Sequence, residues 1–359
     1  MSFRPPVRDD LAELPGYHSP QLDVDVRLNT NESPEPPPAA FQQAIADKVA
    51  ALDWHRYPDR SAAELRAKLA AHHAASAELT ADNIFVANGS NEVLQTILIA
   101  WGGPGRQVLT FEPTYAMHGQ IARVTGTGVI EIDRQHDFTI DADSAIAAIE
   151  QHRPIVTFLC SPNNPTGLVE PRELVERVLA AVAPFGLLVV DEAYAQFSNW
   201  SALTLFDEDA PLIVTRTFSK TWAMAAARLG YLIAPTWITE RLNTAILPYH
   251  LDAVSQAAGS TALDFEDEMA ARVARLVEQR GVIQNGLSDL GIEFWPSHSN
   301  FVLFRPAGDG AVVWQQLVDA GVLVRNCASW PRLEGCLRVT VGSEDENGAF
   351  LEALRAILG

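Results

Sequence analysis

The sequence has few basic residues for its length. It contains 26 lysines and arginines against 45 aspartates and glutamates in 359 residues, a formal net charge of −19 at pH 7, and no stretch gathers the basic residues into a cluster. Nucleic acids and anionic membrane surfaces select clustered positive charge, so this balance argues against both as partners. A small anionic substrate stays open, because its site needs only a few local cations.

Cysteine is scarce as well. Cys160, Cys327 and Cys336 are widely spaced, form no CxxC pair and have no histidine-rich context. Such a set predicts reduced thiols in a cytosolic protein, with neither a disulfide framework nor a metal site. The N-terminus opens no apolar signal segment, and no run approaches the roughly 18 apolar residues of a membrane-spanning helix. We therefore expect a soluble, cytoplasmic protein.

Hydrophobic residues, in contrast, make up 48% of the chain, which is enough for a sizeable core. From residue 84 to residue 234, apolar runs of strand length alternate with helical patterns, and the runs at 155–160, 186–190 and 211–215 are nearly continuous. Continuous runs are typical of parallel strands that are covered on both faces. We therefore expect an α/β domain with a doubly wound, mostly parallel sheet.

The pattern changes after this region. Residues 238–290 are largely helical, and the rest of the chain predicts a compact α+β unit. Near the start of the large domain, Ser61 and Glu64 predict a capping box for the helix that follows. We expect a large domain over residues 40–245, a small domain over residues 246–359, and an N-terminal arm of residues 1–39 that joins the small domain.

Two charged residues follow the continuous runs. Lys220 comes shortly after the run at 211–215, close to the carboxyl end of a predicted strand, where open α/β sheets bind ligands. Asp191 ends the run at 186–190, and a buried carboxylate needs a cationic partner. Taken singly, these residues are also explained by a surface lysine and a structural salt bridge.

A third feature lies between a short strand and an apolar helix, at Gly89 and Ser90. Free N–H groups and the positive end of the helix make such a turn a seat for phosphate, although many turns of this kind look alike. Pyridoxal phosphate (PLP) combines a protonated pyridine, a phosphate and a Schiff base to lysine. Together with Arg228, which follows Lys220, the three features predict a PLP site.

The motifs of the chain resemble those of the fold-type I PLP-dependent aminotransferases, and within them the histidinol-phosphate aminotransferases. The resemblance spans residues 20–355 and implies a large domain with a mostly parallel seven-stranded sheet plus a smaller α+β domain. The motifs are Leu28–Pro34, Arg56–Asp59, Asn88–Glu92, Pro113–Tyr115, Asn163–Gly167, Asp191–Tyr194, Ser219–Lys220, Arg228–Gly230 and Leu337–Gly342.

The resemblance assigns roles to residues that bind the cofactor. Lys220 would hold PLP as a Schiff base and move protons, and Asp191 would keep the pyridine nitrogen protonated. Tyr194 and Asn164 would bond the phenolic oxygen, and Tyr115 would stack on the ring. The phosphate would be held by Ser90, Asn91, Ser219 and Arg228, together with Tyr57 of the neighbouring subunit. A homodimer with shared active sites is therefore expected.

The substrate end rests on fewer residues. Arg338 resembles the arginine that binds the anionic end of the substrate, and Arg325 resembles a second arginine that binds phosphate. Arginine suits this role because its charge is permanent and its guanidinium can form two parallel hydrogen bonds to an anion. Tyr17 and Asn31 resemble arm residues that close over the ligand, beside Tyr57 and Asn164. Two departures stand out: Asn326 replaces the usual aspartate after Arg325, and Ala225–Ala227 replaces a glycine-containing stretch.

The resemblance implies a transamination that interconverts L-histidinol phosphate and 2-oxoglutarate with imidazole-acetol phosphate and L-glutamate, in histidine biosynthesis. It would run in ping-pong order through pyridoxamine phosphate. An aromatic amino-acid aminotransferase on the same scaffold is an alternative, and a PLP-dependent decarboxylase of a phosphorylated amino acid is a more distant one. A PLP-binding transcriptional regulator is disfavoured, because the arm is too short for a DNA-binding domain.

Overall fold

The chain, seen in a computed structural model, is described over residues 4–12, 14, 16 and 21–358. Its larger sheet has the strand order β2-β8-β7-β6-β5-β3-β4, and β8 runs antiparallel to both of its neighbours while the others run parallel. The expected seven-stranded, mostly parallel α/β sheet is thereby confirmed. Its strands are β2 (Ile84–Ala87), β3 (Gln107–Glu112), β4 (Gly128–Asp133), β5 (Val156–Cys160), β6 (Leu187–Asp191), β7 (Leu212–Thr217) and β8 (Gly230–Ile233).

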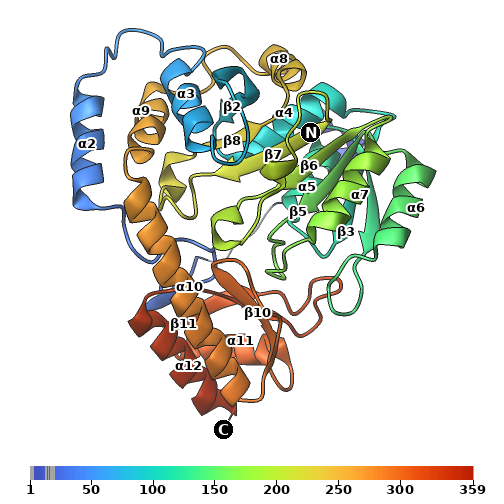
Figure 1. Cartoon of the computed structure of the whole chain (residues 1–359). Coiled ribbons are helices and arrows are strands. Elements are labelled where there is room, and N and C mark those ends of the chain that lie inside the picture. Colours follow the sequence, from blue (N-terminus) through green and yellow to red (C-terminus); the bar gives the residue numbers. More distant parts are fainter. Residues whose placement is uncertain (1–3, 13, 15, 17–20, 359) are drawn as a thin grey trace.

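Helices cover both faces of this sheet (Figure 1). Leu187 and Val189 of β6 pack toward α4, α5 and α8, whereas Leu188 and Val190 pack toward α6 and α7. Because alternate residues of the strand are buried on opposite faces, its sequence is apolar throughout. The helices are α4 (Ser90–Trp101), α5 (Met117–Val124), α6 (Ala142–His152), α7 (Arg172–Val182) and α8 (Thr236–Ala245).

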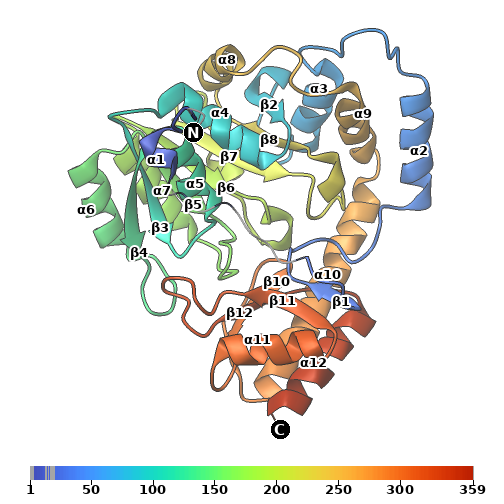
Figure 2. The ribbon, with the colours of Figure 1, turned by 180° about the vertical axis from the view of Figure 1, so that it is seen from behind.

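The smaller sheet has the strand order β1-β11-β12-β10-β9. β1 comes from the N-terminal arm and pairs parallel with β11, beside which it lies in Figure 2. Phe304 and Phe350 pack against each other in the core between this sheet and its helices. The elements are β1 (Val26–Leu28), β9 (Glu293–Phe294), β10 (Phe301–Arg305), β11 (Val322–Asn326), β12 (Leu337–Thr340), α11 (Gly310–Asp319) and α12 (Glu344–Leu358).

The long helix α10 (Glu266–Asp289) connects the two units (Figure 1). Met269, near its start, belongs to the core of the large sheet, whereas Leu276 belongs to the core of the small sheet. We propose that the units divide within this helix, later than residue 245. Besides the helices already given, α2 (Ala39–Ala50), α3 (Ala63–His72) and α9 (Ala253–Ala262) precede this division.

The remaining elements are short. They are α1 (Asp9–Ala12), which lies against α5, and the 3₁₀ turns η1 (Ala81–Asn83), η2 (Ala195–Phe197), η3 (Ala202–Leu205) and η4 (Ala225–Ala227). Within the described ranges, no helix combines the length and the apolar character needed to cross a membrane.

The start of α3 corrects one sequence prediction. Ser61 and Glu64 form no capping box; Ala62 occupies the N-cap position in the left-handed conformation. Instead, the carboxylate of Asp59 accepts hydrogen bonds from the backbone N–H groups of Ala63 (2.7 Å) and Ser61 (2.9 Å). The bond from Ala63 is the main reason why the pKa of Asp59 is lowered. One free donor at the start of the helix, the N–H of Ala63, is thus satisfied by a side chain that precedes the helix.

Close backbone contact at Gly230 leads to a prediction about stability. A Cβ atom there would lie 2.3 Å from the backbone nitrogen of Ser90 and 2.5 Å from the carbonyl carbon of Gly89. Because backbone atoms cannot move aside as a side chain can, we expect Gly230→Ala to lower the free energy of unfolding in urea by about 2–3 kcal/mol.

Gly281, inside α10, provides the matched control. A Cβ atom at this position would meet no atom within 4 Å, so Gly281→Ala should raise the free energy of unfolding by about 0.5–1 kcal/mol, the usual preference for alanine in a helix. A Gly230→Ala protein as stable as the wild type would show that the contact between β8 and the β2–α4 turn is not tight.

Candidate active site

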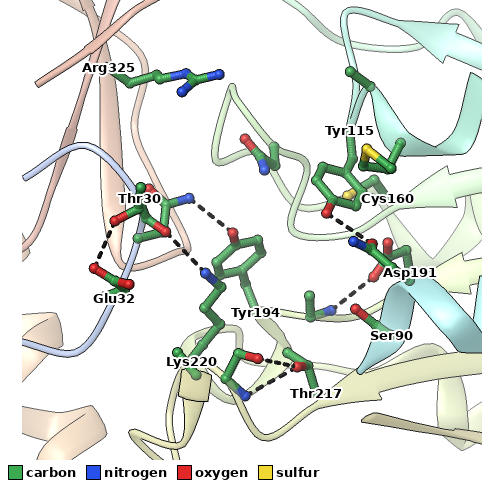
Figure 3. Close-up of a pocket in the computed structure, with 18 of the residues that line it drawn as sticks. Thr30, Glu32, Ser90, Tyr115, Cys160, Asp191, Tyr194, Thr217, Lys220 and Arg325 are labelled. Atoms are coloured by element: carbon green, nitrogen blue, oxygen red, sulfur yellow. Dashed lines mark hydrogen bonds between the residues drawn. The ribbon is translucent and has the colours of Figure 1, made fainter. Parts of the chain in front are cut away.

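A cavity of about 310 Å³ lies at the carboxyl ends of β5, β6 and β7. The large sheet forms one side of it, and the arm segment 29–32 and the small sheet form the other (Figure 3). It brings together most of the residues that the sequence predicted for the site: Asn31, Ser90, Asn91, Tyr115, Asn164, Asp191, Tyr194, Ser219, Lys220, Arg228, Arg325 and Arg338.

Lys220 lies just beyond the end of β7. Its Nζ donates a hydrogen bond to the backbone carbonyl of Thr30 (3.2 Å) and lies 5.9 Å from the centre of the Tyr194 ring (Figure 3). Burial, helped by the charge of Arg338, lowers the pKa of Lys220 to about 8, although Glu32 acts in the opposite direction. A minor fraction of the amine, much larger than for an ordinary lysine, is therefore neutral near physiological pH and can act as a nucleophile or a base.

Asp191, the last residue of β6, is 2% exposed. Its Oδ2 lies 2.9 Å from Nε2 of His118, and its Oδ1 accepts a hydrogen bond from the backbone N–H of Ala193 (3.2 Å). His118 is fully buried on α5 and stacks on Phe158, with 4.7 Å between ring centres. The carboxylate is thus held on two sides, which fixes the direction in which it faces the cavity.

The sequence reasoning missed His118. The residue stands alone in a helical pattern, three residues after the nearest motif, so no spacing marks it. The signal that was available is its position on the buried face of an apolar helix, because a histidine is rarely buried there without a polar partner.

Tyr194 lies beside Lys220. Its hydroxyl accepts a hydrogen bond from Nδ2 of Asn31 (2.9 Å), and its ring meets Phe301 edge-to-face at 5.1 Å. Burial raises the pKa of Tyr194 to about 12, so the hydroxyl stays protonated over the working range of an enzyme. Asn31, predicted as an arm residue at the ligand, does line the cavity.

The turn between β2 and α4 forms a cradle with Arg228. Gly89 has a φ of +82°, and a Cβ atom on it would lie 2.6 Å from Nη2 of Arg228. Nη1 of Arg228 donates to the carbonyl of Ala225 (3.1 Å) and lies 3.5 Å from Oγ of Ser219. Because α4 begins at Ser90, its first N–H groups also lie here. Guanidinium, hydroxyl and backbone donors therefore surround one spot, as an anion requires.

Tyr115 and Asn164 bond to other residues of the site. The Tyr115 hydroxyl donates to Oδ1 of Asn91 (3.1 Å), and Oδ1 of Asn164 accepts from Nη1 of Arg338 (2.6 Å). The stacking of Tyr115 on a cofactor ring and the bond from Asn164 to a phenolic oxygen stay predictions.

Two arginines of the small sheet face the cavity. Arg325 on β11 and Arg338 on β12 are direct register partners, so their side chains leave the same face of the sheet. Arg338 donates to the backbone carbonyl of Asn29 (3.0 Å), and its guanidinium carbon lies 5.1 Å from the centre of the Phe301 ring. Arg325 lies over Trp330, also at 5.1 Å. Both guanidinium groups are buried against aromatic rings, an arrangement that favours a fixed orientation.

Two predicted features lie outside this arrangement. Tyr57 is 80% exposed, stacks on Tyr249 with 4.5 Å between ring centres, and does not line the cavity. Asn326 does not hold Arg325 but accepts a hydrogen bond from the backbone N–H of Ala328 (2.9 Å). Tyr17 lies outside the described residues.

The donor set fits the predicted cofactor. An added Cβ atom at Gly89 would fill the space beside the Arg228 guanidinium. Because glycine has no Cβ atom, this space stays open to an anion such as a phosphate. The buried carboxylate of Asp191 suits a protonated ring nitrogen, and the partly neutral amine of Lys220 suits an aldehyde. The site can therefore hold PLP and exchange protons with a substrate bound beside it.

Comparisons with known proteins identify the family of the chain. Residues 24–354 match the family described as aminotransferase class I and II. The chain is 45% identical to the histidinol-phosphate aminotransferase of Corynebacterium diphtheriae, over 98% of this chain and 96% of that one, and 47% identical to that of Frankia casuarinae, over 97% and 89%. The crystal structure of the histidinol-phosphate aminotransferase from Sinorhizobium meliloti, in complex with pyridoxal-5′-phosphate, matches with a TM-score of 0.87 at 23% identity, over 97% of each chain.

The lowered pKa of Lys220 predicts a pH-dependent stability in the protein without ligand. Between about 8, the pKa in the folded chain, and 10.5, its ordinary value, the unfolded chain binds more protons, so the contribution of this residue to stability rises with pH. Below this window, folding must bury a charged ammonium group.

Lys220→Met removes this titration. The free energy of unfolding of the variant, minus that of the wild type, should be largest below about pH 8 and shrink as the pH approaches 10.5. Urea denaturation of the two proteins across this range measures the difference. A difference that does not change with pH would show that the Lys220 amine is not desolvated.

Proposed function

The chain is an aminotransferase: it belongs to the class I and II aminotransferases, in the family of the histidinol-phosphate aminotransferases. We propose that it depends on PLP and interconverts L-histidinol phosphate and 2-oxoglutarate with imidazole-acetol phosphate and L-glutamate, as a step of histidine biosynthesis in the cytoplasm. The names of its relatives support the reaction, and the fit of the donor set supports the cofactor.

The pairing of Arg325 with Arg338 carries the choice of substrate. Arg338 donates to the side-chain amide of Asn164 and to the backbone carbonyl of Asn29, which hold its guanidinium at the cavity beside the strand that carries Arg325. Two neighbouring guanidinium groups suit the two charges of a phosphate monoester better than the single charge of an α-carboxylate. Histidinol phosphate carries the former and lacks the latter.

The residues of the large domain would hold the cofactor and move the proton. Bound PLP supplies an electron sink and carries the amino group between two half-reactions, in ping-pong order. Asp191, held by His118, keeps a proton on the ring nitrogen. Nζ of Lys220 would take the proton from the substrate carbon that bears the nitrogen and would return it to the cofactor carbon on the other side of that nitrogen. Its pKa of about 8 allows both transfers near neutral pH.

We also propose a homodimer in which Tyr57 reaches the phosphate cradle of the neighbouring subunit. Tyr57 and Tyr249 line a groove together with Trp54, which is 71% exposed. Three large aromatic residues on one surface are typical of a contact between proteins.

The anion site gives the first functional prediction. Arg338→Ala should reduce kcat/KM for L-histidinol phosphate by a factor that corresponds to 2–5 kcal/mol, on the order expected when one partner of a buried charge pair is removed. Turnover of L-histidinol, which has no phosphate, should change little. Arg305→Ala is the control, because Arg305 lies over Trp295 at 5.2 Å on the same sheet but does not line the cavity. Equal losses with both substrates would refute the phosphate role.

The shared site gives the second functional prediction. Lys220→Ala and Tyr57→Ala proteins should each have low activity, and a mixture that is allowed to exchange subunits should recover about a quarter of the wild-type rate, because half of the dimers then contain one intact site. If Tyr57 acts within its own subunit, or if the chain stays monomeric, exchange will restore no activity.

A further inference from the structure

Asn31 is bonded at both ends of its side-chain amide. Nδ2 donates to the hydroxyl of Tyr194 (2.9 Å), and Oδ1 accepts from the hydroxyl of Thr340 (3.1 Å). Its backbone N–H donates to the same hydroxyl of Thr340 (2.9 Å), and its carbonyl accepts from Nδ2 of Asn300 (3.2 Å). The residue is 1% exposed and has a φ of +56°, a conformation that asparagine adopts more readily than most residues.

These bonds determine which way the amide faces. The backbone N–H of Asn31 can only donate, so it occupies a lone pair of the Thr340 oxygen and leaves the hydroxyl proton of Thr340 for the side chain. That proton requires an acceptor, which places Oδ1 toward Thr340 and therefore Nδ2 toward Tyr194. A reversed amide would leave the buried hydroxyl proton of Thr340 with no acceptor among the described hydrogen bonds, so the observed direction of the amide is favoured.

The direction of the amide in turn sets the direction of the Tyr194 hydroxyl. An oxygen that accepts a hydrogen bond from Nδ2 keeps its own proton for another partner. Asn31 offers no acceptor at that end, so the Tyr194 proton is left for a group in the cavity. Figure 3 shows the bond at the Tyr194 hydroxyl, beside Lys220.

We propose that Asn31 is a positioning residue that makes Tyr194 a hydrogen-bond donor to the phenolic oxygen of the bound cofactor. The inference rests on the proposed use of PLP. The small sheet, through Thr340, thereby helps to set the proton affinity of a cofactor that the large sheet holds. A donated bond stabilises negative charge on the phenolic oxygen, so it lowers the pH at which the bound cofactor loses its proton.

The absorbance of the bound cofactor, titrated with pH, measures this effect. Asn31→Asp keeps the acceptor toward Thr340 but places an acceptor toward Tyr194, which must then donate to residue 31. We expect the midpoint of the titration to rise by about one pH unit, on the order of the loss of one hydrogen bond to the charged form. A midpoint equal to that of the wild type would overturn the inference.

A double-mutant cycle with Tyr194→Phe separates the bond from the charge of the new carboxylate. If Asn31 acts through the tyrosine, Asn31→Asp should add little to the midpoint of Tyr194→Phe. A shift that persists in full without the hydroxyl would mean that charge alone is responsible, and would overturn the inference. A wild-type protein that develops no cofactor absorbance would instead refute the proposed cofactor.

Thr340 provides an uncharged test, because it lies outside the described lining of the cavity. Thr340→Val removes the hydroxyl that orients the amide and should raise the midpoint in the same direction by a smaller amount. Thr340→Ser keeps the hydroxyl and should titrate as the wild type does. Identical midpoints for the valine and serine variants would contradict the role of the Thr340 hydroxyl.

Discussion

Burial of the Lys220 amine is the constraint on which the rest of the site depends. A charged ammonium group loses hydration when it is covered, and this lowers the pKa to about 8. The cover comes from the chain itself: the carbonyl of Thr30, in the N-terminal arm, accepts a hydrogen bond from the amine, and the ring of Tyr194 lies beside it. The same burial destabilises the folded chain when the amine is charged, and it increases the fraction of neutral amine that can react.

The arm connects the two ends of the cavity. Over three consecutive residues, the carbonyl of Asn29 accepts from Arg338, the carbonyl of Thr30 accepts from Lys220, and the side chain of Asn31 donates to Tyr194. β1 continues the arm into the small sheet, directly beside the strand that carries Arg325. Arg338, which is proposed to bind the substrate phosphate, and Lys220, which is proposed to move the proton, are therefore both bonded to one short segment of the arm.

The sequence predicted the large sheet well, because β5, β6 and β7 are buried on both faces and their apolar runs are continuous. Short sequence patterns predicted the hydrogen bonds of polar side chains less reliably. Ser61 and Glu64 carry the right spacing for a capping box, but Asp59 instead accepts from the backbone N–H groups of Ser61 and Ala63. The bond between His118 and Asp191 joins residues 73 positions apart, and no local pattern reports such a contact.

The central claim is that the paired arginines select a phosphorylated substrate. The most direct test is the rate of the half-reaction of the wild-type protein, loaded with PLP, measured by the absorbance of the cofactor in single turnovers with L-histidinol phosphate and with L-phenylalanine. The account predicts that histidinol phosphate reacts faster at equal, subsaturating concentrations. Faster reaction of phenylalanine would contradict it and would assign the arginines to an α-carboxylate.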